Sequence, residues 1–200
     1  SIVIPGSVKN IANSAFSNCT ALSEVTISEG VESIGDSAFR YCSNLGSVDI
    51  SSSVKNIDNC AFANCTSLTN VILNEGTERI GDGAFNECSA LTSIDFPATL
   101  TSIGDYAFNA TNLTNVTILS NITDYDRAFW GASNLTTVNF DEDVTVIPVG
   151  GFSGSGLKEI EIPDSVTEID NSAFRGCVSL VDITIPKSVV DIGTRVFSGC

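Results

Sequence analysis

The sequence predicts an α/β repeat solenoid, in which one short structural unit is stacked end to end from residue 1 to residue 200. A small or aliphatic residue followed by phenylalanine recurs at steps of 21 to 23 residues, at Phe16, Phe39, Phe62, Phe85, Phe108, Phe129, Phe152, Phe174 and Phe197. A constant period in this range indicates one supersecondary unit repeated many times. About nine units of roughly 23 residues follow one another without a linker, so the sequence predicts a single domain.

Each unit begins with a short strand. Val48-Asp49-Ile50 has apolar residues on either side of a polar one, the alternation typical of a half-buried strand. A strand this short needs neighbours, which parallel stacking of the units supplies. The equivalent strands are expected at Ser1–Pro5, 25–27, 71–73, 94–96, 116–118, 138–140, 160–162 and 183–185.

The second half of each unit is expected to form a short helical turn. Aspartate or asparagine stands just before the turn, in Gly35-Asp36, Gly81-Asp82, Gly104-Asp105 and Asp170-Asn171. Such side chains cap helices. A helical turn would place Phe39 and Cys42 on one face, because residues three apart are neighbours on a helix. The phenylalanine, the cysteine and the next leucine should therefore point inward.

The unit reads approximately L-x-x-I-x-I-P-x-x-V-x-x-I-G-x-x-A-F-x-x-C, and it resembles the BspA-like class of leucine-rich repeats. The segment LVDITIPKSVVDIGTRVFSGC, at residues 180–200, matches this pattern closely, and the resemblance covers essentially the whole chain. The resemblance implies a parallel sheet on a concave face and short helical turns or loops on a convex face. It also implies a cell-surface or secreted protein of bacteria or some protists that binds host proteins or other cells, with no catalytic motif position.

Three units in the middle of the array depart from the pattern. The steps from Phe108 to Leu113 and from Phe152 to Leu157 are each one residue short, and these units have threonine or serine in place of cysteine. The step from Ile122 to Phe129 is also one residue short, and it holds Tyr125 in place of the usual isoleucine. We expect the middle to bend or twist differently from the ends and residues 119–156 to be the least stable part.

Composition narrows the classes of function. Nine basic residues stand against 24 acidic ones, giving a net charge of −15, so nucleic acid and anionic membranes are poor partners. Basic proteins, cationic surfaces and Ca²⁺ remain open, as does a simple role of the acidity in solubility. The chain has no histidine and no phosphate-binding loop, which disfavours an enzyme and predicts no cofactor or metal site.

The ends of the sequence carry no polar cap. The chain starts inside an expected strand and stops at Cys200, and no apolar run approaches the roughly 20 residues of a membrane helix. No signal peptide or anchor is visible. Because solenoids need caps for solubility, we expect a piece of a longer array or a mature, processed product. The resemblance implies a location at the cell surface or outside the cell.

Six of the seven cysteines occupy one repeat position and are expected to be buried free thiols that act as small apolar residues. They are Cys19, Cys42, Cys65, Cys88, Cys177 and Cys200. Disulfides within this row are the alternative, but parallel side chains give poor bridge geometry. Cys60 and Trp130 lie in slots expected to face solvent. Either could make a lateral contact, Cys60 through an intermolecular bond, but chance exposure is the favoured explanation for Cys60, and local packing explains Trp130 equally well.

The leading hypothesis is a non-enzymatic protein-binding or adhesion module that binds through the concave sheet. Its partner would be a protein on a host or neighbouring cell, or another copy of the chain. The residues expected to contact the ligand project outward from the strands: Glu24, Thr26, Asp49, Asp95, Asn139, Glu161 and Asp182. The alternatives are a structural segment of a surface layer or filament that assembles through its uncapped ends, and an intracellular scaffold, whose reducing compartment would suit free cysteines.

Overall fold

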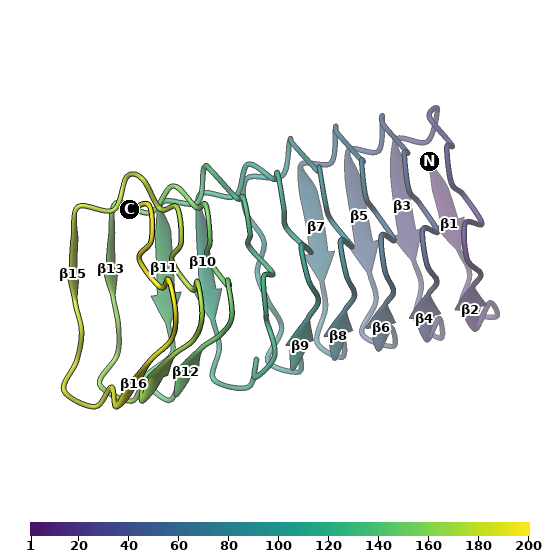
Figure 1. Cartoon of the computed structure of the whole chain (residues 1–200). Helices are drawn as coiled ribbons and strands as arrows, with labels where there is room; N and C mark the ends of the chain where they lie inside the picture. The colour runs from purple at the N-terminus through teal and green to yellow at the C-terminus, as the bar shows by residue number, and fades with distance from the viewer.

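A computed structural model describes all 200 residues as a solenoid of parallel strands (Figure 1). The two termini lie at opposite ends of the solenoid. One face carries the longer strands: β1 (Ile2–Ile4), β3 (Glu24–Ile27), β5 (Ser47–Ile50), β7 (Asn70–Leu73), β10 (Asn115–Ile118), β11 (Thr137–Phe140), β13 (Glu159–Glu161) and β15 (Asp182–Thr184). We call this the long-strand face.

A second face carries two-residue strands, each of which ends on the isoleucine that recurs in nearly every unit. These are β2 (Asn10–Ile11), β4 (Ser33–Ile34), β6 (Asn56–Ile57), β8 (Arg79–Ile80), β9 (Ser102–Ile103), β12 (Val146–Ile147), β14 (Glu168–Ile169) and β16 (Asp191–Ile192). These short strands were not among those expected from the sequence. The third side of each coil is the turn that contains Ala-Phe, which we call the turn face.

The strand registers place equivalent residues side by side. Val25, Val48 and Val71 are partners across β3, β5 and β7, and the polar residues between them also align, as Thr26 does with Asp49. Because neighbouring side chains of a strand point to opposite sides, one set is buried and the other faces solvent. The expected parallel sheet and its period-two pattern are confirmed.

The core is organised around the phenylalanines. From Phe16 to Phe197, each ring stacks on the next with centroids 5.0–5.9 Å apart and planes 2–13° from parallel. The seven rings from Phe39 to Phe174 are fully buried, whereas the two end rings are half-buried. This single row of rings runs through every coil of the solenoid.

The expected helical turns are wrong, because the structure contains no helix. The residues two before and two after each phenylalanine have left-handed backbone conformations, for example Ser37 (φ 55°) and Tyr41 (φ 62°) around Phe39. A right-handed helix cannot continue through such residues. Each turn is instead a pair of tight turns, closed by Ala38 N–H to Gly35 O and Cys42 N–H to Phe39 O.

The turn face is held together by hydrogen bonds between coils. The amide of each phenylalanine from Phe16 to Phe174 donates to the next coil, at 2.7–3.1 Å, as Phe39 does to Ala61 O. Two of the residues expected as helix caps, Asp82 and Asn171, link the coils here instead. Asp82 Oδ1 accepts from Asp105 N at 3.0 Å, and Asn171 Oδ1 accepts from Thr194 N at 2.7 Å.

The long-strand face, unlike the turn face, is broken twice. Strand pairing connects β1, β3, β5 and β7, then β10 with β11, and then β13 with β15. Residues 94–96 do not form the expected strand, so the prediction of a strand there is wrong. The second break separates β11 from β13, which are not hydrogen-bonded neighbours.

Each break coincides with a larger side chain at the last inward position of the strand. Most strands end on isoleucine or leucine, but Phe96 packs 5.7 Å from Phe108, and Phe140 packs 5.9 Å from Phe152. The coils of Phe108 and Phe152 are also the two that lack a residue before the next leucine. A bulky ring inside a shortened coil displaces the backbone from regular pairing, at residues 94–96 themselves in the first break and between β11 and the next strand in the second.

The cysteine row is free, and four of its six members are buried, as expected: Cys42, Cys65, Cys88 and Cys177. The expectation is wrong for Cys19 and Cys200, which are exposed because they lie in the end coils. The thiols also do more than fill space. Cys65 Sγ donates to Phe39 O at 3.2 Å and Cys88 Sγ to Phe62 O at 3.2 Å, so each thiol satisfies a carbonyl of the preceding coil.

We predict that a thiol reagent at pH 8 modifies Cys19, Cys60 and Cys200 in the folded protein and the other four cysteines only after unfolding. Burial raises the pKa of Cys88 from 9.0 to about 12, which keeps it protonated. The Cys88 thiol ionises at lower pH in the unfolded chain than in the folded protein. Its titration therefore leaves the free energy of unfolding unchanged below pH 9 and lowers that free energy between pH 9 and about pH 12. Mass spectrometry of the labelled protein checks the pattern, and rapid native labelling of Cys88 would contradict it.

Candidate protein-binding face

The seven residues expected to contact a ligand all lie on the long-strand face, half-buried or exposed, and none is buried. Glu24 and Thr26 lie on β3, Asp49 on β5 and Asn139 on β11, while Glu161 and Asp182 lie on β13 and β15. Asp95 lies in the first break rather than on a strand. The structure places these side chains on the surface of the long-strand face, and their contact with a ligand stays a prediction.

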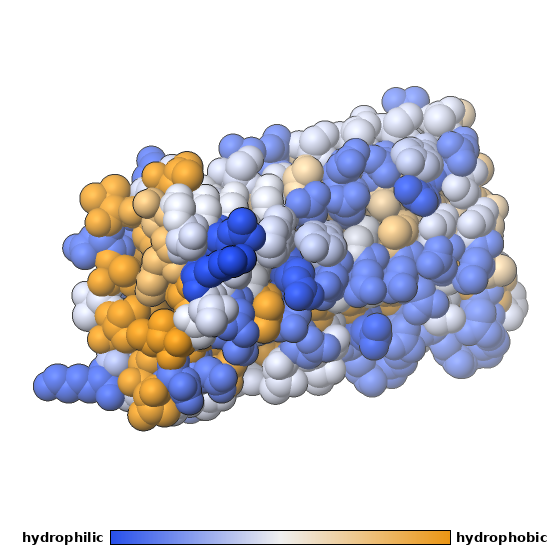
Figure 2. All heavy atoms as spheres, viewed as in Figure 1, coloured by the Kyte–Doolittle hydropathy of each residue, from blue (hydrophilic) through white to orange (hydrophobic).

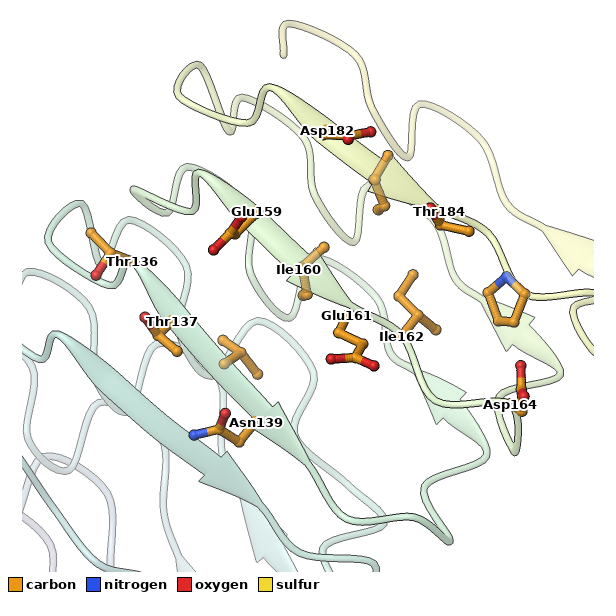
Figure 3. Close-up of a pocket in the computed structure, with 13 residues that line it drawn as sticks. Thr136, Thr137, Asn139, Glu159, Ile160, Glu161, Ile162, Asp164, Asp182 and Thr184 are labelled. Atoms are coloured by element: carbon orange, nitrogen blue, oxygen red, sulfur yellow. The ribbon is translucent and has the colours of Figure 1, made fainter.

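Three hollows divide these residues into groups. The largest, about 640 Å³, lies over β11, β13 and β15 and is lined by Asn139, Glu161 and Asp182 (Figure 3). A second, of about 490 Å³, is lined by Thr26 and Asp49. A third, of about 240 Å³, lies at the first break beside Asp95. Glu24 lines none of the three.

We call the largest hollow the β11–β13 groove, because it lies over the second break. Thr137 and Asn139 of β11 stand on one side of it, and Glu159 and Glu161 of β13 stand on the other (Figure 3). Asp182 and Thr184 of β15 and Asp164 of the following loop complete its polar rim, and Val138, Ile160, Ile162, Ile183 and Pro186 supply its apolar part. Sequence reasoning named three of these residues but not the groove.

The carboxylates of the groove have no partner within the protein. No hydrogen bond or ion pair reaches Glu159, Glu161, Asp164 or Asp182, and the groove lining contains no lysine or arginine. The acidic residues of the second hollow differ. Glu29 accepts hydrogen bonds from the amide and hydroxyl of Ser52, at 2.9 and 2.8 Å, and these bonds lower the pKa of its carboxyl.

Other acidic side chains of this face also bond within the solenoid. Glu75 Oε1 accepts from Ala98 N at 3.2 Å, and Asp49 Oδ1 accepts from the Asn74 amide at 3.2 Å. These carboxylates have a structural use, whereas the four in the β11–β13 groove are free to meet a ligand.

Trp130 and Cys60 lie on the turn face, away from the groove. Trp130 is half-buried, as expected, with its ring edge-on to Tyr106 at 6.1 Å. A Cβ added at Gly150 would lie 3.1 Å from the indole ring, so Trp130 packs over the coil that follows. Cys60 is half-buried at one of the left-handed positions (φ 54°). Local packing accounts for Trp130, and a lateral contact through either residue stays a prediction.

No group of three histidine, cysteine, aspartate or glutamate residues is placed to hold a metal ion. No helix has the length and apolarity needed to cross a membrane.

A comparison with known protein families agrees with this fold of parallel coils around a buried phenylalanine row. The model of the BspA type leucine rich repeat region matches residues 1–92 and 78–200. The chain therefore belongs to the BspA-type leucine-rich repeat family. None of the curated proteins matches it significantly.

Solved structures with the same fold come from several bacteria. A leucine rich cell surface protein from Faecalibacterium prausnitzii is 30% identical, with a TM-score of 0.67, and the match covers 99% of this chain and 64% of that one. A leucine-rich repeat protein from Eubacterium ventriosum is 29% identical, with a TM-score of 0.62, over 86% of this chain and 56% of that one. The chain thus spans less than two thirds of either relative.

The pneumococcal vaccine antigen PcpA shares the fold at 21% identity and a TM-score of 0.59, over 99% of this chain and 59% of PcpA. Its likeness bears on architecture alone.

Proposed function

We propose that this chain is a non-enzymatic protein-binding module of a cell-surface or secreted protein and that it binds through the long-strand face. The observation that carries the proposal is the set of free carboxylates on this face, above all those of the β11–β13 groove. Charged groups without an internal partner add nothing to folding and remain available for complementary charges. Membership of a leucine-rich repeat family and a relative named as a cell surface protein support this class of function.

The chain lacks the histidine that most acid–base and nucleophile-activating sites use, which supports a role in binding rather than catalysis. The partner expected from a face of short polar and acidic groups is a protein with a basic surface. A host protein, a protein of a neighbouring cell and a second copy of the chain all belong to this class. Nucleic acid and membrane insertion do not fit the net charge of −15.

Substitution on the face tests the proposal. The triple variant Asp49→Ala, Asp95→Ala, Glu161→Ala should weaken binding to a panel of immobilised secreted and cell-surface proteins by about tenfold, while circular dichroism stays unchanged. The matched control Asp58→Ala, Glu168→Ala, Asp191→Ala removes three exposed carboxylates outside this face. Equal weakening by both variants would show that net charge, not the long-strand face, determines binding.

Self-assembly through the ends is a second candidate function, favoured by apolar exposure on the last coil. Ile192 is 52% exposed, whereas its equivalents Ile147 and Ile169 in the preceding coils are fully buried, and Figure 2 shows apolar atoms gathered at that end. On the turn face, each phenylalanine amide donates to the next coil. The same bond could continue between two copies of the chain, from Phe197 N–H at the end of one copy to Ala15 O at the start of another.

Sedimentation velocity of the 200-residue chain over a concentration series tests this candidate. It predicts a size that grows with concentration and an Ile192→Lys variant that stays monomeric. A monomer at every concentration would remove it.

A further inference from the structure

The face of two-residue strands, which we call the short-strand face, is interrupted between the coils of Phe129 and Phe152. Strand pairing connects β2, β4, β6, β8 and β9, and separately β12, β14 and β16. No backbone hydrogen bond joins residues 121–126 of one coil to residues 143–148 of the next. Pro148, which follows the isoleucine of β12, has no amide hydrogen to donate to the preceding coil. The two coils therefore lack backbone pairing on this face.

One side chain crosses the interruption. Tyr125 stands in the slot that isoleucine fills in most coils, and it is buried, with its ring 6.1 Å from Phe152. Its hydroxyl donates to Val146 O in the next coil at 3.2 Å. Because a buried tyrosine hydroxyl needs a partner, the ring position and this bond depend on one another. Tyr125 therefore supplies the link between the two coils that the backbone lacks on this face.

The residues on either side of Tyr125 are both aspartates. Since Tyr125 points into the core, Asp124 and Asp126 point outward on the same side of the chain. Asp124 is exposed and accepts a hydrogen bond from Ser102 Oγ at 3.2 Å, whereas Asp126 is half-buried. Two carboxylates that are ionised at this separation repel one another. Their repulsion opposes the conformation in which Tyr125 is seated inward.

The surrounding charges do not cancel the repulsion. Asp105 of the preceding coil pairs with Arg127 at 2.9 Å, so this guanidinium is shared among several carboxylates. Residues 146–149 of the following coil carry no charge. Burial and the charge of Asp124 raise the pKa of Asp126; Asp105 adds to this rise and Arg127 opposes it.

The folded chain therefore binds a proton at Asp126 more readily than the unfolded chain does. The stability gained from that proton is present at low pH and is lost as the pH rises through the raised pKa of Asp126.

We propose that Asp124, Tyr125 and Asp126 form a pH-sensitive joint between the coils of Phe129 and Phe152. Acid neutralises Asp126, removes its repulsion with Asp124 and favours the inward position of Tyr125, whose hydroxyl bridges the coils. At neutral pH the repulsion weakens this bridge, and the coils are held by the turn face and by the pairing of β10 with β11.

The joint has a consequence for the long-strand face. β11, β13 and β15 all lie on the C-terminal side of the joint, so the β11–β13 groove moves with the coils beyond it. The inference goes beyond the proposed function and does not depend on what the groove binds.

Asp126→Asn, which keeps the side chain neutral at every pH, tests the joint by amide hydrogen exchange. The amides of Arg127 and Asp141 donate across the joint, to Val149 O and Ile118 O. At pH 7 they should exchange about two- to threefold more slowly in the variant than in the unmodified chain, after correction for the intrinsic rates. The difference should shrink as the pH is lowered to about 4, where Asp126 is protonated in the unmodified chain.

Asp58→Asn is the matched control, because Asp58 is an exposed aspartate in the coil of Phe62 and its replacement makes the same change of net charge. It should leave exchange at Arg127 and Asp141 unchanged. An equal effect of the two variants, or no effect of Asp126→Asn at pH 7, would overturn the joint.

Tyr125→Phe tests whether the bridge carries the effect. This variant keeps a buried ring but lacks the hydroxyl, and it should speed exchange at Arg127 and Asp141 by about threefold. Adding Asp126→Asn to it should then slow exchange by less than about 1.5-fold. If Asp126→Asn slows exchange as much in the Tyr125→Phe background as in the unmodified chain, protonation acts without the bridge and the proposal is wrong.

Discussion

Replacing Phe62 by alanine should lower the free energy of unfolding by about 3–5 kcal/mol, the range for large truncations in a packed core. Phe62 is fully buried, and its ring stacks on Phe39 at 5.2 Å and on Phe85 at 5.4 Å. The substitution removes both contacts and leaves a cavity between two coils that the backbone ladder holds in place. Urea unfolding followed by circular dichroism measures the loss.

Phe16→Ala is the matched control for this variant. Phe16 lies in the first coil, is half-buried and has one stacked neighbour, Phe39, at 5.0 Å. Its replacement should cost less than about half as much, because less buried surface is lost. A loss below about 1 kcal/mol for Phe62→Ala would show that the phenylalanine row does not hold the coils together.

Replacing Gly76 by alanine should destabilise the solenoid by roughly 2–5 kcal/mol, through a strained backbone and a steric clash between coils. Gly76 has φ +132°, a conformation that side chains rarely tolerate, and an added Cβ would lie 1.8 Å from Ser52 O. Because that oxygen belongs to the backbone of the preceding coil, the clash cannot be relieved by a side-chain rotation.

Gly46→Ala provides the comparison. Gly46 has an ordinary backbone conformation, and an added Cβ would come no closer than 3.6 Å to Ser23 O. We expect a change within about 0.5 kcal/mol. Thermal unfolding of the two variants side by side measures the difference, and equal midpoints would contradict the close approach of the coils at Gly76.

The repeat period was enough to predict the solenoid, most strands of the long-strand face and the inward-facing row of phenylalanines. Those features follow from residues that recur in every unit, so each unit supports the interpretation of the others. The outward positions of residues such as Asp49 and Glu161 followed from strand alternation. The ligand of that face has no comparable signal, because a binding surface need not repeat.

The helical turns were predicted wrongly because aspartate before Ala-Phe is also typical of a helix cap. Ser37 and Tyr41 adopt left-handed conformations that their residue types do not favour. One signal was present in the sequence: glycine occupies the same two positions in other coils, for example Gly150 and Gly154 around Phe152. Glycine recurring two residues before and after a core residue favours a left-handed turn over a helix.

The breaks in the long-strand face could not be found from the strand pattern alone. Ile94-Asp95-Phe96 has the same alternation as Val48-Asp49-Ile50, yet only the second forms a strand. The difference lies in the size of Phe96 and in the residue missing after Phe108. Phe96 packs against Phe108 in the folded coil, so the two features disturb the same place although they are apart in the sequence. The sequence placed the irregular segment at 119–156, whereas the interruptions of the sheet lie near 92–96 and 158.

Amide hydrogen exchange, read residue by residue, tests most directly the claim that the long-strand face is open at these two places while the turn face is continuous. The account predicts slow exchange at Phe85, Phe129 and Phe152, whose amides donate to the next coil. On the long-strand face, the bonded amides of Thr69, Thr136 and Val181 should exchange at least about ten times more slowly than those of Thr92 and Lys158. Equal protection of all five would mean that the sheet is unbroken.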